Sequence, residues 1–283
     1  MSTQLPARRL PVQRSIQSFA TTLLLTAAAS IVTVIATPAG RAAIAPIPTP
    51  DISTVGEPVA QTTSADLEAR MNQAIAALEA TNYAEALTFF EEAIAIDATH
   101  APAHAGKGLA LYNLGRYPES ISALEEAVQL DETHLFAWMW LGISLDDGGQ
   151  PEVALGAYER AIAIDPNVGD VYFHQGVTLA RLERYEEAFA SYDRAVQLNP
   201  EMPVAWVNRG RMAGIMDNLD EALVSFERAI EIYPEYVDAW YYKGVVLSFM
   251  ERNEEAIVAF ERVLELDPSY PQAQENLDRL RTS

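Results

Sequence analysis

The sequence has no cysteine and only four histidines. The absence of cysteine excludes disulfide bonds, thiolate chemistry, cysteine-ligated metals and lipid attachment to a cysteine. It does not indicate a compartment, because a chain without cysteine can fold in oxidising or reducing surroundings. The histidines never bring three potential ligands together, so we expect no metal ion at any of His100, His104, His134 and His174.

Basic residues are scarce, since 19 lysines and arginines stand against 40 aspartates and glutamates. The chain up to Asp66 holds four arginines and three acidic residues, so the remainder carries nearly all of the acidic excess. A surface this acidic repels a phosphate backbone, and we therefore expect no nucleic-acid partner. It favours solubility and basic partners.

Motifs of catalysis are absent as well. The chain has no phosphate-binding loop, no dinucleotide fingerprint and no nucleophile elbow. Paired acidic residues recur at or near the starts of predicted second helices, where they complement the helix dipole without catalysis: Glu91-Glu92, Glu125-Glu126, Glu186-Glu187 and Glu254-Glu255. We therefore expect a protein that is not an enzyme and that binds no cofactor.

Residues 1–40 form either a signal peptide or a membrane anchor. Three arginines lie at or before Arg14, no charge follows until Arg41, and residues 19–36 read FATTLLLTAAASIVTVIA. This order of basic start, apolar middle and small residues is typical of an export signal, with cleavage expected after Ala39. The run is also long enough to anchor the chain through residues 16–36. In both cases the positive start stays in the cytoplasm, so the remainder is expected in a periplasm or an equivalent lumen.

Residues 41–65 are predicted to form a disordered, proline-rich linker. Their prolines break helices and strands, and their few apolar side chains cannot form a core. The segment therefore reads as a semi-extended tether that contains Pro46, Pro48, Pro50 and Pro58.

A repeat with a period of about 34 residues governs the chain from position 67 to position 270. Apolar residues spaced three and four apart predict two helices in each period, and a proline follows the second helix at Pro166, Pro200, Pro234 and Pro268. A column of small residues keeps the same spacing at Gly108, Gly142, Gly176, Gly210 and Gly244. Glycine weakens a helix interior, so its recurrence indicates that helices cross closely there.

These columns resemble the tetratricopeptide repeat family, which one unit matches at Trp138, Gly142, Leu145, Ala154, Tyr158, Ala161 and Pro166. The first two units depart from the pattern, with Arg70 and His104 where the others have an aromatic residue. The resemblance implies an all-α fold: a right-handed superhelical solenoid of six helix-turn-helix repeats. Their boundaries are 67–100, 101–134, 135–168, 169–202, 203–236 and 237–270, and residues 271–283 form a polar capping helix. An unrelated helical bundle is the alternative.

Trp138 and Trp140 have different expected roles. On a helix they point about 200° apart, so one apolar stripe cannot hold both. Trp138 shares its column with Tyr172, Trp206 and Trp240, and we expect it to pack between the two helices of its unit. Trp140 belongs to no such column, and the resemblance places its position on the concave face of the solenoid.

The resemblance implies that this concave face is a partner-binding groove. Aromatic side chains and arginine are typical of binding hot spots, and an exposed apolar patch usually marks a binding site. Alternatively, neighbouring units bury much of this stripe. Asp146 or Asp147 is expected to reach the face, which is predicted to comprise Tyr112, Phe136, Met139, Trp140, Phe173, His174, Asn208, Arg211, Tyr241, Tyr242 and Phe249.

The expected partner is an apolar or aromatic protein segment, with a possible basic flank. Some family members hold a peptide's terminal carboxylate with several lysines and asparagines, whereas this chain offers only Asn208, Arg211 and Arg181 at such positions. We expect a non-catalytic scaffold, exported or membrane-anchored, that assembles an envelope or membrane complex. A recruitment subunit of an enzyme complex and a cytosol-facing, membrane-anchored adaptor are the alternatives.

Overall fold

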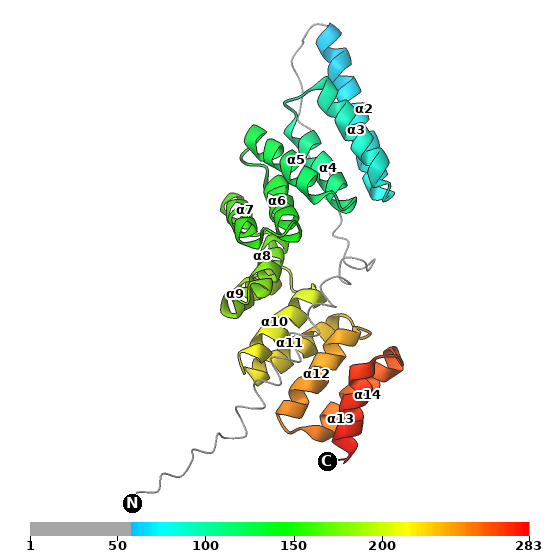
Figure 1. Ribbon diagram of the computed structural model, residues 1–283, viewed down its shortest axis with the longest axis vertical. Coiled ribbons are helices and arrows are strands. Elements are labelled where there is room, and N and C mark those ends of the chain that lie inside the picture. Colours follow the sequence, from blue (N-terminus) through cyan, green and yellow to red (C-terminus); the bar gives the residue numbers. More distant parts are fainter. Residues whose placement is uncertain (1–57, 283) are drawn as a thin grey trace, which may run out of the picture. The chain divides into compact units, whose positions relative to one another are not determined.

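The computed structural model describes residues 58–282, which form thirteen α-helices and no strand (Figure 1). The helices of the first three pairs are α2 (Pro58–Glu79), α3 (Tyr83–Ile96), α4 (Ala101–Asn113), α5 (Tyr117–Leu130), α6 (Leu135–Asp147) and α7 (Pro151–Ile164). The others are α8 (Gly169–Arg181), α9 (Tyr185–Leu198), α10 (Pro203–Ile215), α11 (Leu219–Ile232), α12 (Val237–Phe249), α13 (Asn253–Leu266) and α14 (Pro271–Thr282).

The helix pairs follow the predicted repeats and confirm the all-α repeat fold. Helices α4, α6, α8, α10 and α12 each begin at the residue where a repeat unit was predicted to start. α14 is the predicted capping helix. Residues 1–57, which hold the expected signal or anchor, lie outside the described residues. No helix within residues 58–282 is both long and apolar enough to cross a membrane.

One boundary prediction was wrong. Helix α2 begins at Pro58, so residues 58–65 are helical and do not belong to the predicted linker. A proline is tolerated at the first position of a helix, because its missing N–H would have no partner there. Pro58, predicted to break helical structure, therefore starts the first helix.

The chain divides into two compact units after Glu183. Helices α2–α8 form the described part of the N-terminal unit, and α9–α14 form the C-terminal unit. In the first, α2 packs on α3, α4 on α5, and α6 on α7 and, more loosely, α8. In the second, α10 packs on α9 and α11, while α13 packs on α12 and α14.

The glycine column is confirmed as a site of close helix crossing. A Cβ added at Gly142 would lie 2.5 Å from the buried Tyr158 ring of the second helix. At Gly244, the corresponding distance to the Phe260 ring is 2.8 Å. Both aromatic residues are at most 1% exposed, so the rings have little room to retreat.

Each turn between paired helices contains one residue with left-handed backbone. Two of them are Gly115 and Gly149, with φ of 73° and 83°. In the C-terminal unit the same position holds Asp217 and Glu251, with φ of 63° and 60°. The next residue donates its N–H back to the first helix, as Arg252 does to the Leu247 carbonyl at 2.9 Å, which ends the helix in a Schellman-type cap.

Trp138 on α6 is partly exposed and contacts the second helix of its unit, α7, through Arg160. Its indole Nε1 donates to the Glu132 carbonyl at 2.9 Å, and the Arg160 guanidinium lies 5.4 Å from its ring centre. Trp206 and Trp240 donate in the same way to the Pro200 and Pro234 carbonyls, each at 2.9 Å. This column therefore ties each first helix to the loop before it, at a partly exposed position.

Candidate partner-binding face

The predicted groove residues all lie on first helices of repeats, and they fall into two groups. One group, which we call the N-terminal face, consists of Tyr112 on α4, Phe136, Met139 and Trp140 on α6, and Phe173 and His174 on α8. The other, the C-terminal face, consists of Asn208 and Arg211 on α10, and Tyr241, Tyr242 and Phe249 on α12. Each face belongs to one unit.

Aromatic rings are in contact across two repeats of the N-terminal face. The Trp140 ring meets the Tyr112 ring edge to face, with centroids 5.2 Å apart, and lies 6.0 Å from the Phe136 ring. Tyr112 is buried, whereas Phe136, Met139 and Trp140 remain partly exposed. The Trp140 Nε1 atom is itself buried and has no acceptor among the described residues. Packing alone therefore holds this indole.

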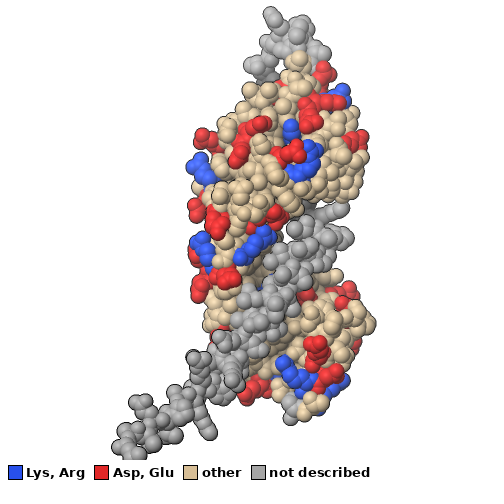
Figure 2. Space-filling model, in the orientation of Figure 1, with Lys and Arg blue, Asp and Glu red and all other residues tan. Residues whose placement is uncertain are grey.

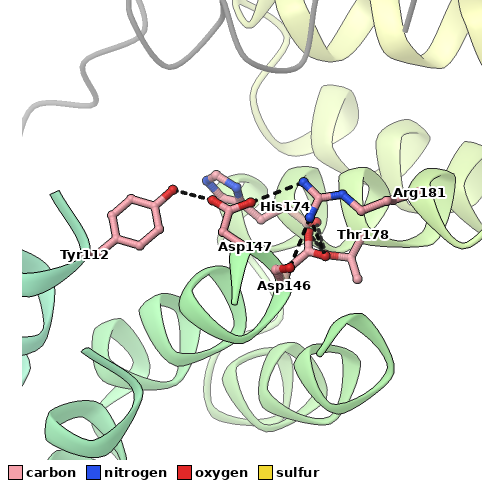
Figure 3. Close-up of polar contacts among 6 residues, drawn as sticks. All are labelled: Tyr112, Asp146, Asp147, His174, Thr178 and Arg181. Atoms are coloured by element: carbon pink, nitrogen blue, oxygen red, sulfur yellow. Dashed lines mark hydrogen bonds and ion pairs between the residues drawn. The ribbon is translucent and has the colours of Figure 1, made fainter. Parts of the chain in front are cut away.

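A polar network joins the same helices (Figure 3). The Tyr112 hydroxyl donates to Asp147 Oδ2 at 2.6 Å, and the Arg181 guanidinium donates to Asp147 Oδ1 at 3.2 Å. Arg181 also reaches Asp146 Oδ1 at 3.0 Å, and Thr178 donates to Asp146 Oδ2 at 2.9 Å. Asp147 thus lies between α4 and α8, with the His174 ring beside it.

Burial shifts the ionisation of this network. It raises the pKa of Asp146, although Arg181 and the Thr178 hydroxyl partly offset that shift. Burial, and then the hydrogen bond to Asp147, raises the pKa of Tyr112, which stays protonated. Burial lowers the pKa of His174 to about 4, so this imidazole is neutral at pH 7.

The C-terminal face is largely closed, which corrects the prediction for Tyr241 and Tyr242. Both are 1% exposed and belong to the hydrophobic core of their unit. The Tyr241 ring lies 5.0 Å from Tyr270, which precedes the capping helix, and the Tyr242 ring stacks on Phe226 at 5.7 Å. The last repeat packs against the capping segment, so residues expected to face a partner pack inward instead.

Arg211, also predicted for the groove, is only 5% exposed. Its guanidinium lies 5.3 Å from the Tyr242 ring centre and donates to Asn208 Oδ1 at 3.1 Å. In the N-terminal unit, Arg181 forms ion pairs with the carboxylates of Asp146 and Asp147. Neither arginine is presented as an open site for a peptide carboxylate, whereas Phe249 and Asn208 are partly exposed.

The described residues offer little for other kinds of site. Within residues 58–282, no group of three or more histidine or acidic side chains is arranged to hold a metal ion. On the face drawn in Figure 2, basic and acidic side chains are interspersed over the described surface. Thr178 is the member of the polar network that sequence reasoning missed, because a threonine inside a helix carries no distinctive motif.

Family models described as tetratricopeptide repeat match residues 59–101, 71–134, 105–168, 139–203, 203–236 and 237–270. The chain belongs to the tetratricopeptide repeat family. A comparison with curated proteins gives no match.

Solved structures share the repeat fold at low sequence identity. YrrB, described as a TPR protein with an unusual peptide-binding site, is 24% identical over 66% of this chain and 96% of its own, with a TM-score of 0.58. PilF of Pseudomonas aeruginosa is 15% identical over 76% of this chain and 97% of its own, with a TM-score of 0.67. MamA of Desulfovibrio magneticus RS-1 is 23% identical over 60% of this chain and 97% of its own, with a TM-score of 0.54. At these identities the likeness concerns the fold.

Proposed function

We propose that this tetratricopeptide repeat protein is a non-catalytic scaffold that holds a segment of another protein on its N-terminal face. The observation that carries the proposal is the set of partly exposed large apolar side chains on α6 and α8: Phe136, Met139, Trp140 and Phe173. Structural columns of the repeat recur with its period, whereas Phe136 has no aromatic counterpart in the other repeats and the Trp140 column is not kept as a large aromatic in the adjacent ones. Residues that the fold does not require, and that stay accessible, suit partner binding.

The proposed partner is an extended or helical segment that buries an apolar or aromatic side chain beside Trp140. The Trp140 ring packs against the Tyr112 and Phe136 rings, so a partner would meet a preordered aromatic surface with little ordering cost. The acidic surface disfavours acidic segments and favours a basic flank.

The proposed location is outside the cytoplasm, with the repeats exported or anchored at the membrane and acting in assembly of an envelope complex. Its support is the sequence of residues 1–40, with arginines before an apolar run. Protease treatment of intact and permeabilised cells tests the location. Digestion of the repeats after opening only the outer compartment supports export, whereas protection until the cytoplasm is opened would indicate a cytosol-facing adaptor.

Site-specific photocrosslinking in the native host tests the binding face. A photoreactive phenylalanine analogue replaces Phe136 on the N-terminal face or, as a control, Val153, which is 58% exposed on α7. We expect a protein adduct from position 136, little from position 153, and loss of the first adduct when Trp140→Ala is added. Equal adducts from both positions, or an adduct insensitive to Trp140→Ala, would place binding elsewhere.

A further inference from the structure

Asp146 and Asp147 are an acidic pair that the repeat does not require. In the neighbouring repeats their positions hold Tyr112 and Asn113 on one side, and Ala180 and Arg181 on the other. The fold-determining columns of this chain keep one residue type or closely similar ones through most of the repeats, as the glycines do. An acidic pair confined to one repeat therefore needs another explanation.

Its placement is electrostatically unfavourable. The pair forms the last turn of α6, where the helix dipole already contributes partial negative charge. Asp146 is only 5% exposed. Among the described residues, Arg181 is the one cation within ion-pair distance of either carboxylate. When both carboxylates are ionised, the single guanidinium of Arg181 leaves a net charge of about −1 at the edge of the aromatic cluster.

Asp147 is the accessible member of the pair. Its side chain is 22% exposed, against 6% for that of Asp146. It accepts hydrogen bonds from Tyr112 and Arg181, and a carboxylate has capacity for further donors. The Tyr112 ring, whose hydroxyl binds Asp147, meets the Trp140 ring 5.2 Å away. A carboxylate and two electron-rich rings are thus adjacent, which is the combination that attracts organic cations.

We propose that the N-terminal face is a receptor for a basic side chain, and that the bound segment places a lysine or arginine against the exposed side of Asp147 and over the partly exposed Trp140 ring. This inference rests on the proposed function and adds the chemistry of the partner. The cation would neutralise the excess charge at the end of α6. Its aliphatic stem would cover Trp140 and Phe136, because lysine and arginine place apolar stems on apolar surface.

The test selects random dodecapeptides displayed on phage against the detergent-solubilised full chain. Three targets are compared: the wild type, Asp147→Asn, and Glu125→Gln. Asp147→Asn closely keeps the shape of the side chain but removes one charge. Glu125 is exposed on α5 and forms no ion pair among the described residues, so Glu125→Gln removes the same charge from a different place. Circular dichroism first establishes that the targets are equally helical.

We expect wild-type and Glu125→Gln selections to share peptides with a lysine or arginine beside an aromatic residue. Their affinity should fall about tenfold for Asp147→Asn, and about tenfold for the wild type when norleucine replaces the basic residue. The two changes combined should cost little more than either alone, because they remove the same pair. Peptides without basic enrichment, or additive losses in the combined test, would overturn the inference.

The outcome for Trp140→Ala separates this inference from the proposed function. If Trp140→Ala abolishes peptide binding while Asp147→Asn leaves it unchanged, the face binds a segment but does not recognise a basic side chain in it. If neither variant weakens binding, both the proposed function and the charge-recognition inference are wrong.

Discussion

The two units use the same repeat positions in opposite ways. Trp140 and Tyr242 occupy the same column of the repeat, since three full periods separate them. Trp140 is partly exposed and contacts two other rings of the N-terminal face. Tyr242 is 1% exposed, packed between Phe226 and Tyr241 in the core.

The difference shows that the position of a residue in the repeat determines the side of the helix on which its side chain lies, but not whether that side chain is accessible to solvent. In the C-terminal unit, Phe226 and Tyr241 pack against Tyr242, and Tyr270, which precedes the capping helix, packs against Tyr241. In the N-terminal unit, the end of α6 carries two carboxylates that share one cation, Arg181. Partner binding is therefore expected where packing is incomplete and charge is unbalanced.

The largest predicted effects are losses of unfolding free energy that differ between the two faces. Tyr242→Ala removes a fully buried ring, so we expect the free energy of unfolding to fall by ~3–5 kcal/mol. Trp140→Ala removes a partly exposed ring and should cost only ~1–2 kcal/mol. Urea denaturation followed by circular dichroism measures both. Equal losses would mean that Trp140 is a core residue, and the contrast between the faces would fail.

The glycine column should behave alike in both units, which sharpens the contrast with the faces. Gly142→Ala places a methyl group 2.5 Å from the Tyr158 ring, and Gly244→Ala places one 2.8 Å from Phe260. We expect the free energy of unfolding to fall by ~2–3 kcal/mol for Gly142→Ala and by ~1–2 kcal/mol for Gly244→Ala. Gly156 is the matched control, because nothing lies within 4 Å of its added Cβ. Gly156→Ala should stabilise helix α7 by up to ~1 kcal/mol, and the opposite sign would refute the packing argument.

Acid should weaken the N-terminal unit specifically, because histidines cap its helices. His100 Nδ1 accepts from the Ala103 N–H at 3.2 Å, and His134 Nδ1 from the Ala137 N–H at 3.3 Å. At the corresponding N-cap positions of the C-terminal unit, Met202 before α10 and Tyr236 before α12 make no such side-chain bond. Protonation removes the acceptor, at a helix end that also disfavours positive charge.

Burial lowers the pKa of both capping histidines. The folded chain thus takes up these protons less readily than the unfolded chain, so each cap stabilises fully above the ordinary pKa of about 6.5 and is lost as pH falls below it. Each cap contributes about 1 kcal/mol. Hydrogen exchange at the start of α6, corrected for intrinsic rate, should speed about fivefold from pH 7.5 to 5.5, but not in His134→Asn. Equal acceleration in both proteins would exclude the cap as the cause.

Features that recur with the period were predictable from the sequence, and features that depend on a single repeat were not. The glycine column predicted the crossings that the Tyr158 and Phe260 contacts confirm, because close approach is a property of every repeat. The burial of Tyr242 was missed, because it depends on which side chains the neighbouring turns supply. Helix α2 also begins earlier than predicted, since a proline marks a start or a stop according to the residues after it.

Part of the polar network could have been read from the sequence. Asp147 and Arg181 are opposite charges one period apart, on first helices of consecutive repeats, and their side chains meet at 3.2 Å. Because equivalent positions of consecutive repeats lie on neighbouring first helices, opposite charges one period apart are predicted to form an ion pair. The Tyr112–Asp147 bond breaks that register by one residue, and only the geometry of adjacent helix ends reveals it.

The smallest predicted effect concerns the turns, where the two units again differ. The left-handed position is glycine at Gly149 of the N-terminal unit and glutamate at Glu251 of the C-terminal unit. A side chain in this conformation costs about 1 kcal/mol, which glycine avoids, while glycine's freedom in the unfolded chain offsets part of the gain. We therefore expect Glu251→Gly to raise the free energy of unfolding by ~0.5 kcal/mol, and Gly149→Glu to lower it by ~0.5–1 kcal/mol. Thermal denaturation of both variants checks the signs; a destabilised Glu251→Gly would show that this glutamate stabilises its turn through contacts that outweigh the backbone cost.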